Sequence, residues 1–172
     1  MKYYIWGNCG TGKTTLAKRI SKKLSIPMLD LDSIVFKENW EVVDRQIFIN
    51  KVSEFTKNES YVISGSWRKL LGDMLLEDSD IIIVLQLSYL SNMKAMFTRT
   101  LSRIIKNREI HGANKESFRK SFLTKDSIIY YCHSKYNIRL KQGIEIKNDE
   151  RFCDKTIIIN GFKSQNKFIE NL

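Results

Sequence analysis

The stretch that decides the fold is Gly7-Asn8-Cys9-Gly10-Thr11-Gly12-Lys13-Thr14-Thr15, which fits the pattern GxxxxGK[ST] at every constrained position. Glycines let a backbone wrap so that successive amide groups point inward around an anion. A helix expected to begin near Lys13 adds the positive end of its dipole to the same anion. The stretch therefore predicts a loop that binds the phosphates of a nucleotide.

The side chains of this loop suggest how the phosphates are held. We expect Lys13 to reach the β- and γ-phosphates and the Thr14 hydroxyl to occupy one position around Mg²⁺. Thr15 is expected to hydrogen-bond the α-phosphate, and Cys9 is interpreted as a small filler, with a redox role as the minor alternative. The predicted cofactors are ATP and Mg²⁺, with Thr14 as the metal ligand. The predicted cofactor-binding residues are Gly7, Asn8, Cys9, Gly10, Thr11, Gly12, Lys13, Thr14 and Thr15.

The sequence around the loop alternates short apolar runs with amphipathic stretches. The predicted strands are residues 2–6, 28–31, 61–64, 80–87 and 155–160. The predicted helices are residues 13–25, 44–56 with Asp44 as the N-cap, 90–107, a stretch within 116–141, and a terminal helix ending near 172. Segments 38–43 and 108–115 are predicted loops. Strands that alternate with helices indicate a parallel sheet covered on both faces.

Composition limits the remaining possibilities. The 172 residues, 42% of them hydrophobic and 28% charged, fit one globular domain. Three cysteines without CxxC spacing argue against a disulfide or zinc framework. The longest apolar run, residues 81–85, is far below the ~18 residues that span a bilayer, and the N-terminus lacks the apolar core of a signal peptide. We therefore expect a soluble cytoplasmic protein without a membrane partner.

Basic charge is concentrated in one part of the chain. The net charge is +10, and residues 91–125 hold nine Lys and Arg against two Glu. Such a field attracts phosphates, whether on a nucleotide or on a nucleic acid. A solvated helix face is the alternative interpretation of the same residues.

Three further segments narrow the choice among phosphate-loop proteins: Leu29-Asp30-Leu31-Asp32, Trp40, and Ile63-Ser64-Gly65-Ser66-Trp67-Arg68. Together they resemble the adenylate kinase-like family called DNA topology modulation proteins (FlaR-type), a branch of the P-loop NTPases. The resemblance covers about the first 110 residues well. It implies a three-layer α/β fold with a five-stranded parallel sheet flanked by helices. It also implies a single domain over residues 1–172 with an arginine-rich helical lid at about 99–125.

The resemblance also suggests residue roles beyond the loop. Asp32, at the end of a parallel strand, is expected to act as the base on an acceptor hydroxyl or to hold a water on Mg²⁺, and a helix cap is its alternative. Arg68 is expected to grip an acceptor phosphate or carboxylate, and a surface ion pair is its alternative. Trp40 is interpreted first as packing or a loop lock. The predicted catalytic residues are Lys13, Asp32, Arg68 and the lid arginines Arg99, Arg103 and Arg108.

One departure from the family pattern matters for the metal. The family usually has Ile-Asp-Gly-Asn-Tyr-Arg where this chain has Ile63 to Arg68, so Ser64 replaces the acid expected to support Mg²⁺. A serine still holds a metal-bound water but lacks the charge. Asp32 is expected to substitute for it in part.

These observations predict a P-loop kinase that transfers the γ-phosphoryl group of Mg·ATP to a nucleotide or another small molecule. The alternative is a nucleotide-binding, nucleic-acid-associated factor with weak or no kinase activity, and a polynucleotide 5′-hydroxyl kinase is a third possibility. No helix-turn-helix, zinc-finger or RNA-binding signature is evident, so a nucleic-acid partner is possible but not favoured.

Overall fold

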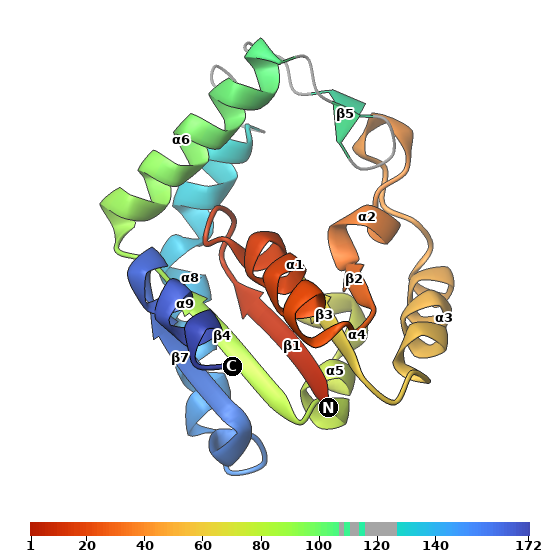
Figure 1. The fold of residues 1–172 in the computed structure, drawn as a ribbon. Coiled ribbons are helices and arrows are strands. Elements are labelled where there is room, and N and C mark those ends of the chain that lie inside the picture. Colours follow the sequence, from red (N-terminus) through yellow and green to blue (C-terminus); the bar gives the residue numbers. More distant parts are fainter. Residues whose placement is uncertain (107–108, 111–113, 116–126) are drawn as a thin grey trace.

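A central sheet of five parallel strands organises the molecule (Figure 1). The computed structural model describes residues 1–106, 109–110, 114–115 and 127–172. The strands lie in the order β2-β3-β1-β4-β7, which confirms the predicted α/β sheet. Their bounds are β1 (Lys2–Gly7), β2 (Met28–Asp30), β3 (Tyr61–Ser64), β4 (Ile81–Gln86) and β7 (Thr156–Asn160).

Helices connect the strands and cover both faces of the sheet. Their bounds are α1 (Lys13–Leu24), α2 (Leu31–Val35), α3 (Arg45–Thr56), α4 (Arg68–Leu71), α5 (Met74–Asp78), α6 (Tyr89–Ile105), α8 (Ile128–Asn148) and α9 (Gly161–Glu170), with 3₁₀ turns η1 (Glu38–Trp40) and η3 (Cys153–Lys155). None of the helices within the described ranges is both long enough and apolar enough to cross a membrane.

The two faces of the sheet form two separate apolar cores. On one face, Leu16 and Ile20 of α1 pack with Phe168 of α9 against Ile5 and its neighbours. On the other face, α3, α5 and α8 cover Tyr4 and Trp6. Buried β-branched residues of β4 contribute to both cores, as expected for a central parallel strand. The carboxyl ends of the strands therefore meet at one rigid edge.

Side-chain caps fix where two of the helices begin. The predicted N-cap is confirmed, because Asp44 accepts hydrogen bonds from the amides of Gln46 at 2.8 Å and Ile47 at 3.3 Å. The predicted strand 28–31 is one residue too long, and helix α2 at Leu31 was missed. Asp30 accepts a hydrogen bond from the Asp32 amide at 3.3 Å, and this cap turns the chain into α2 immediately after β2.

The segment expected to form the lid rises from α6. This helix runs unbroken from Tyr89 to Ile105, so the predicted lid boundary at residue 99 lies inside it. The predicted loop 108–115 contains a two-stranded antiparallel pair, β5 (Glu109–Ile110) and β6 (Asn114–Lys115). Strand β6 lies against η1, and Figure 1 shows β5 near α2. Residues 116–126 of the predicted helical stretch are outside the described part of the chain.

Candidate active site

The phosphate loop joins the end of β1 to the start of α1, as its motif predicts. Gly12 caps α1 with φ 93°, and a Cβ on it would lie 2.9 Å from Oε1 of Gln165. A side chain at this position would therefore be strained and crowded. Gln165 of α9 in turn donates from Nε2 to the carbonyl oxygen of Thr11 at 2.9 Å. The loop is thus held from the C-terminal helix as well as from its own strand.

Lys13 lies across the mouth of the loop. Its ammonium group donates to the carbonyl oxygens of Gly7 at 3.0 Å and Asn8 at 2.9 Å. Thr15, at the solvent side of the same helical turn, is exposed. The Lys13 ammonium group thus contacts the backbone of the loop, close to where the motif would place a phosphate.

A buried polar cluster fixes the other side of the loop, and we call it the Asn92 clamp. Asn92 of α6 donates from Nδ2 to the Cys9 carbonyl at 2.6 Å and accepts at Oδ1 from Nδ2 of Asn8 at 2.9 Å. Asn8 also donates to the carbonyl of Cys132 in α8 at 3.3 Å. Burial raises the pKa of the Cys132 thiol to about 12, so the thiol stays protonated as a donor near neutral pH. The clamp consists of Asn8, Cys9, Asn92 and Cys132, and it joins α6 and α8 to the loop.

The residues at the ends of α1, β2 and β3 fit a hydrated divalent cation. Thr14 donates its hydroxyl proton to Oδ2 of Asp30 at 3.0 Å. Asp30 pairs in register with Ser64 on the neighbouring parallel strand, so both side chains lie on the face covered by α1. The Ser64 hydroxyl is fully buried and has no hydrogen-bond partner among the described residues. Hard oxygen ligands and an orphaned hydroxyl are what a magnesium ion with its bound waters requires.

Asp32, the expected partial substitute for the missing acid, has a tryptophan as its side-chain partner. Its Oδ1 accepts a hydrogen bond from the indole Nε1 of Trp67 at 2.7 Å. The Trp67 ring packs edge-on against Phe36 and Phe48, with centroid separations of 5.5 Å and 6.2 Å. Asp30, two residues earlier and at the strand end, takes the place beside Thr14. The two carboxylates therefore have different side-chain partners.

Arg68 is placed in an ion pair. Its Nε lies 2.5 Å from Oδ1 of Asp73, and Arg151 approaches the other oxygen of Asp73 at 3.0 Å. The hydrogen bond from Arg68 and its charge hold the pKa of Asp73 below its usual range. The structure thus shows Arg68 in the alternative arrangement, a partly exposed ion pair.

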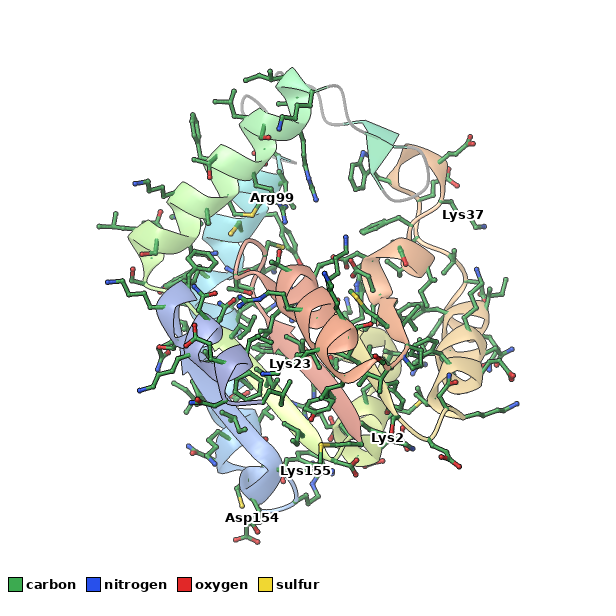
Figure 2. All side chains as sticks on the ribbon, in the orientation of Figure 1. Lys2, Lys23, Lys37, Arg99, Asp154 and Lys155 are labelled. Atoms are coloured by element: carbon green, nitrogen blue, oxygen red, sulfur yellow. The ribbon has the colours of Figure 1, made fainter. Side chains whose placement is uncertain are left out.

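Two of the three lid arginines lie on the helix face that meets the loop. Asn92, Met96, Arg99 and Arg103 recur at intervals of four, three and four residues, which places them on one side of α6. Burial raises the pKa of Cys132 overall, and the charges of Arg99 and Lys13 oppose that rise. Figure 2 shows Arg99 on α6 near the phosphate loop, whereas Lys2 and Lys155 lie at the far end of the sheet. Arg108 is outside the described residues.

Sequence reasoning missed the roles of three residues. The position of Asp30 at the strand end, like that of Asp32, is a signal for a site role. Trp67 stands where the pattern of the resembled family has tyrosine, and this difference is its one signal. Asn92 carried no signal, because a single asparagine in an amphipathic helix resembles a surface residue.

Comparison with known proteins identifies the family. A sequence model of the family described as shikimate kinase matches residues 9–139, which is most of the chain. The chain belongs to the shikimate kinase family. The match includes the phosphate loop from Cys9 onward, Asp30, Asp32 and α6.

Individual members of the shikimate kinase family match over shorter stretches. A shikimate kinase from Caldicellulosiruptor bescii is 39% identical over 59 residues, which are 34% of this chain and 34% of that protein. A shikimate kinase from Bacteroides thetaiotaomicron is 32% identical over 75 residues, covering 37% of this chain and 43% of that protein. The matched stretches span less than half the length of these relatives.

Solved structures of two kinases share the fold over nearly the whole chain. The shikimate kinase from Bacteroides thetaiotaomicron superposes with a TM-score of 0.57 at 14% identity, covering 99% of this chain and 95% of that one. A gluconokinase from Sinorhizobium meliloti 1021 gives 0.56 at 16% identity, covering 99% and 94%. The family model thus confirms the P-loop kinase part of the sequence resemblance, and these structures confirm the fold. Neither the family model nor these relatives is a DNA topology modulation protein.

Proposed function

We propose that this member of the shikimate kinase family transfers the γ-phosphoryl group of Mg·ATP to a hydroxyl group of a small-molecule acceptor. The observation that carries the proposal is the separation of two carboxylates at one sheet edge. Asp30 is bonded to Thr14 of the phosphate loop at 3.0 Å, and Asp32 is turned toward Trp67 at 2.7 Å. In this proposal Asp30 would serve the donor side and Asp32 the acceptor side.

On the donor side, each polar group has a place in phosphoryl transfer. Loop amides and Lys13 would hold the phosphates, while Thr14, Asp30 and Ser64 would hold the magnesium ion and its waters. When bound, magnesium would neutralise charge on the β- and γ-phosphates. Lys13 needs only to exchange two carbonyl oxygens for phosphate oxygens, which are stronger acceptors for an ammonium group.

On the acceptor side, Asp32 would accept the proton of the attacking hydroxyl. Trp67 occupies Oδ1, so the acceptor would be met by Oδ2. Arg99 and Arg103 lie on the same side of α6 as Asn92, which contacts the loop, and they would offset the charge on the transferring group. The acceptor would lie beside Asp32, on the side of its Oδ2.

The test is ADP release from Mg·ATP across a panel of acceptors, with Lys13→Ala as the inactive variant. The panel holds shikimate, gluconate, other small hydroxy acids, nucleosides, nucleoside monophosphates and 5′-hydroxyl oligonucleotides. We expect one class to raise ADP release at least tenfold above the basal rate, and Lys13→Ala to abolish the increase. Exposed Lys57 pairs with Glu54 far from the loop, so Lys57→Ala serves as the matched control. Basal release alone with every acceptor would contradict the proposal.

The narrower resemblance to DNA topology modulation proteins provides the alternative function. Its support is the net charge of +10 and the basic stretch 91–125. A phosphate-contacting protein loses duplex affinity steeply as salt rises. Tight duplex binding with such a salt dependence, together with no acceptor-dependent turnover, would favour this alternative over a kinase.

A further inference from the structure

The turn after β3 contacts both halves of the candidate site. Gly65 has φ 141° and donates its amide to the Ile5 carbonyl at 3.1 Å, which continues the pairing with β1. A Cβ on Gly65 would lie 2.7 Å from Cβ of Leu31. The absence of a side chain lets the chain turn directly against α2. Ser66 and Trp67, the next two residues, therefore lie at the edge of the sheet where the loop and Asp32 are found.

Ser66 is the contact with the phosphate loop. Its hydroxyl donates to the Gly7 carbonyl at 2.7 Å and accepts from the Gly7 amide at 3.1 Å. The Gly7 carbonyl also receives the ammonium group of Lys13 at 3.0 Å. Ser66 and Lys13 thus share one acceptor. A change in the position of Lys13 changes the hydrogen bonding that Ser66 experiences.

Trp67 is the contact with the acceptor side. Its indole donates to Asp32 at 2.7 Å, and Phe36 and Phe48 hold the ring at near-perpendicular angles of 73° and 72°. An indole N–H is a donor only, so it fixes one carboxylate oxygen without competing for the acceptor proton. The ring packing removes the rotational freedom that would let Asp32 swing toward the cation site beside Asp30.

We propose that Ser66 and Trp67 are positioning residues that couple the phosphate loop to Asp32, and we call them the Ser66–Trp67 bridge. The contacts form a closed circuit, from the loop through Thr14, Asp30 and Asp32 to the bridge and back to Gly7. When a bound phosphate draws Lys13 away from the Gly7 carbonyl, Ser66 remains as a donor to that oxygen. The hydrogen bond of Ser66 then changes, and with it the position of the bridge. The proposal rests on the proposed function in one respect, namely that Asp32 faces the acceptor.

The first test needs no acceptor and uses the indole N–H signals of the three tryptophans in an NMR spectrum. Trp67→Phe identifies the Trp67 signal, and Asp32→Ala is expected to move that signal more than those of Trp6 and Trp40. Saturating Mg·ATP is expected to move it in the wild type. In Ser66→Ala at saturating nucleotide the movement is expected to fall by at least half, whereas Ser134→Ala, at a remote exposed position of α8, leaves it intact.

An unchanged Trp67 signal in Asp32→Ala would overturn the contact between Trp67 and Asp32. An equal response to Mg·ATP in Ser66→Ala and the wild type would overturn the coupling.

The second test measures turnover of Trp67→Phe, which removes the N–H and keeps an aromatic ring. We expect kcat to fall about tenfold to hundredfold with KM for ATP within twofold, because Asp32 is misplaced while the loop is intact. An unchanged kcat would overturn the positioning role. If the wild type shows no acceptor-dependent turnover, the proposed function fails, and the NMR arm still decides whether the bridge exists.

Discussion

Ser64 is the residue at which this chain departs most clearly from the pattern of the DNA topology modulation proteins that it resembles. It is fully buried at the end of β3, its hydroxyl lacks a partner among the described residues, and it is in register with Asp30. A carboxylate at this position would give the cation site a second negative charge. In the absence of a cation, it would instead place two like charges side by side in a buried location, which is unfavourable.

Ser64→Asp is therefore expected to have opposite effects with and without the cation. The melting temperature in EDTA should fall, whereas Mg·ATP should bind more tightly and raise the melting temperature by more than it does in the wild type. Calorimetric titration and thermal melts measure both quantities. Unchanged or weaker Mg·ATP binding would count against a cation site formed by Thr14, Asp30 and Ser64.

The positions of Asp30 and Asp32 could be predicted from the sequence, but their contacts could not. The sequence places Asp30 and Asp32 at the end of one strand, and that much could be predicted. Which of them meets Thr14 depends on the turn into α2, which Asp30 itself caps. A hydrogen bond between residues 35 positions apart, from Trp67 to Asp32, has no signature in either local segment.

At the scale of elements, the Asn92 clamp joins helix α6 to the phosphate loop. Strand and helix positions were largely predictable, because periodicity and β-branched runs determine them. The face of α6 that would meet the loop was not predictable, since its one decisive residue is a buried asparagine between apolar neighbours. The short helices α4 and α5 were also missed, because four or five residues carry no periodic pattern.

Asn92→Ala is expected to lower the free energy of unfolding by about 2 kcal/mol or more, because the Cys9 carbonyl and the Asn8 amide lose a buried partner. The ATP dissociation constant should rise as well, since the loop is held less firmly. Urea denaturation and calorimetric titration check these effects. Thr98→Ala on the exposed side of α6 is the matched control, with an expected change within about 0.5 kcal/mol. Equal effects of the two substitutions would exclude the clamp.

At the scale of the whole molecule, an ion-pair network joins segments far apart in the chain. Asp73, before α5, contacts Arg68 after β3 and Arg151 after α8, and Arg151 also pairs with Asp149. The pKa of Asp73 is lowered in the folded state, chiefly by the hydrogen bond from Arg68. A lowered carboxyl pKa contributes stability above the unfolded-state value and loses it as the pH falls through the folded-state value.

Asp73→Asn is therefore expected to be less stable than the wild type at neutral pH, and the difference should shrink below about pH 4. Thermal melts of both proteins across this pH range measure the effect. Glu54→Gln, which removes a fully solvated pair with Lys57, is the control and should show little difference at any pH. A constant difference at every pH would show that packing, and not charge, is what the substitution changes.

The most direct measurement of kinase activity is the fate of the γ-phosphate of isotopically labelled ATP. The label is followed by mass spectrometry in the presence of the acceptor that most increases ADP release, for the wild type and for Lys13→Ala. We expect the wild type to place the label on the acceptor in proportion to the ADP formed, and Lys13→Ala to place none there. Label recovered only as inorganic phosphate would contradict the proposed kinase activity.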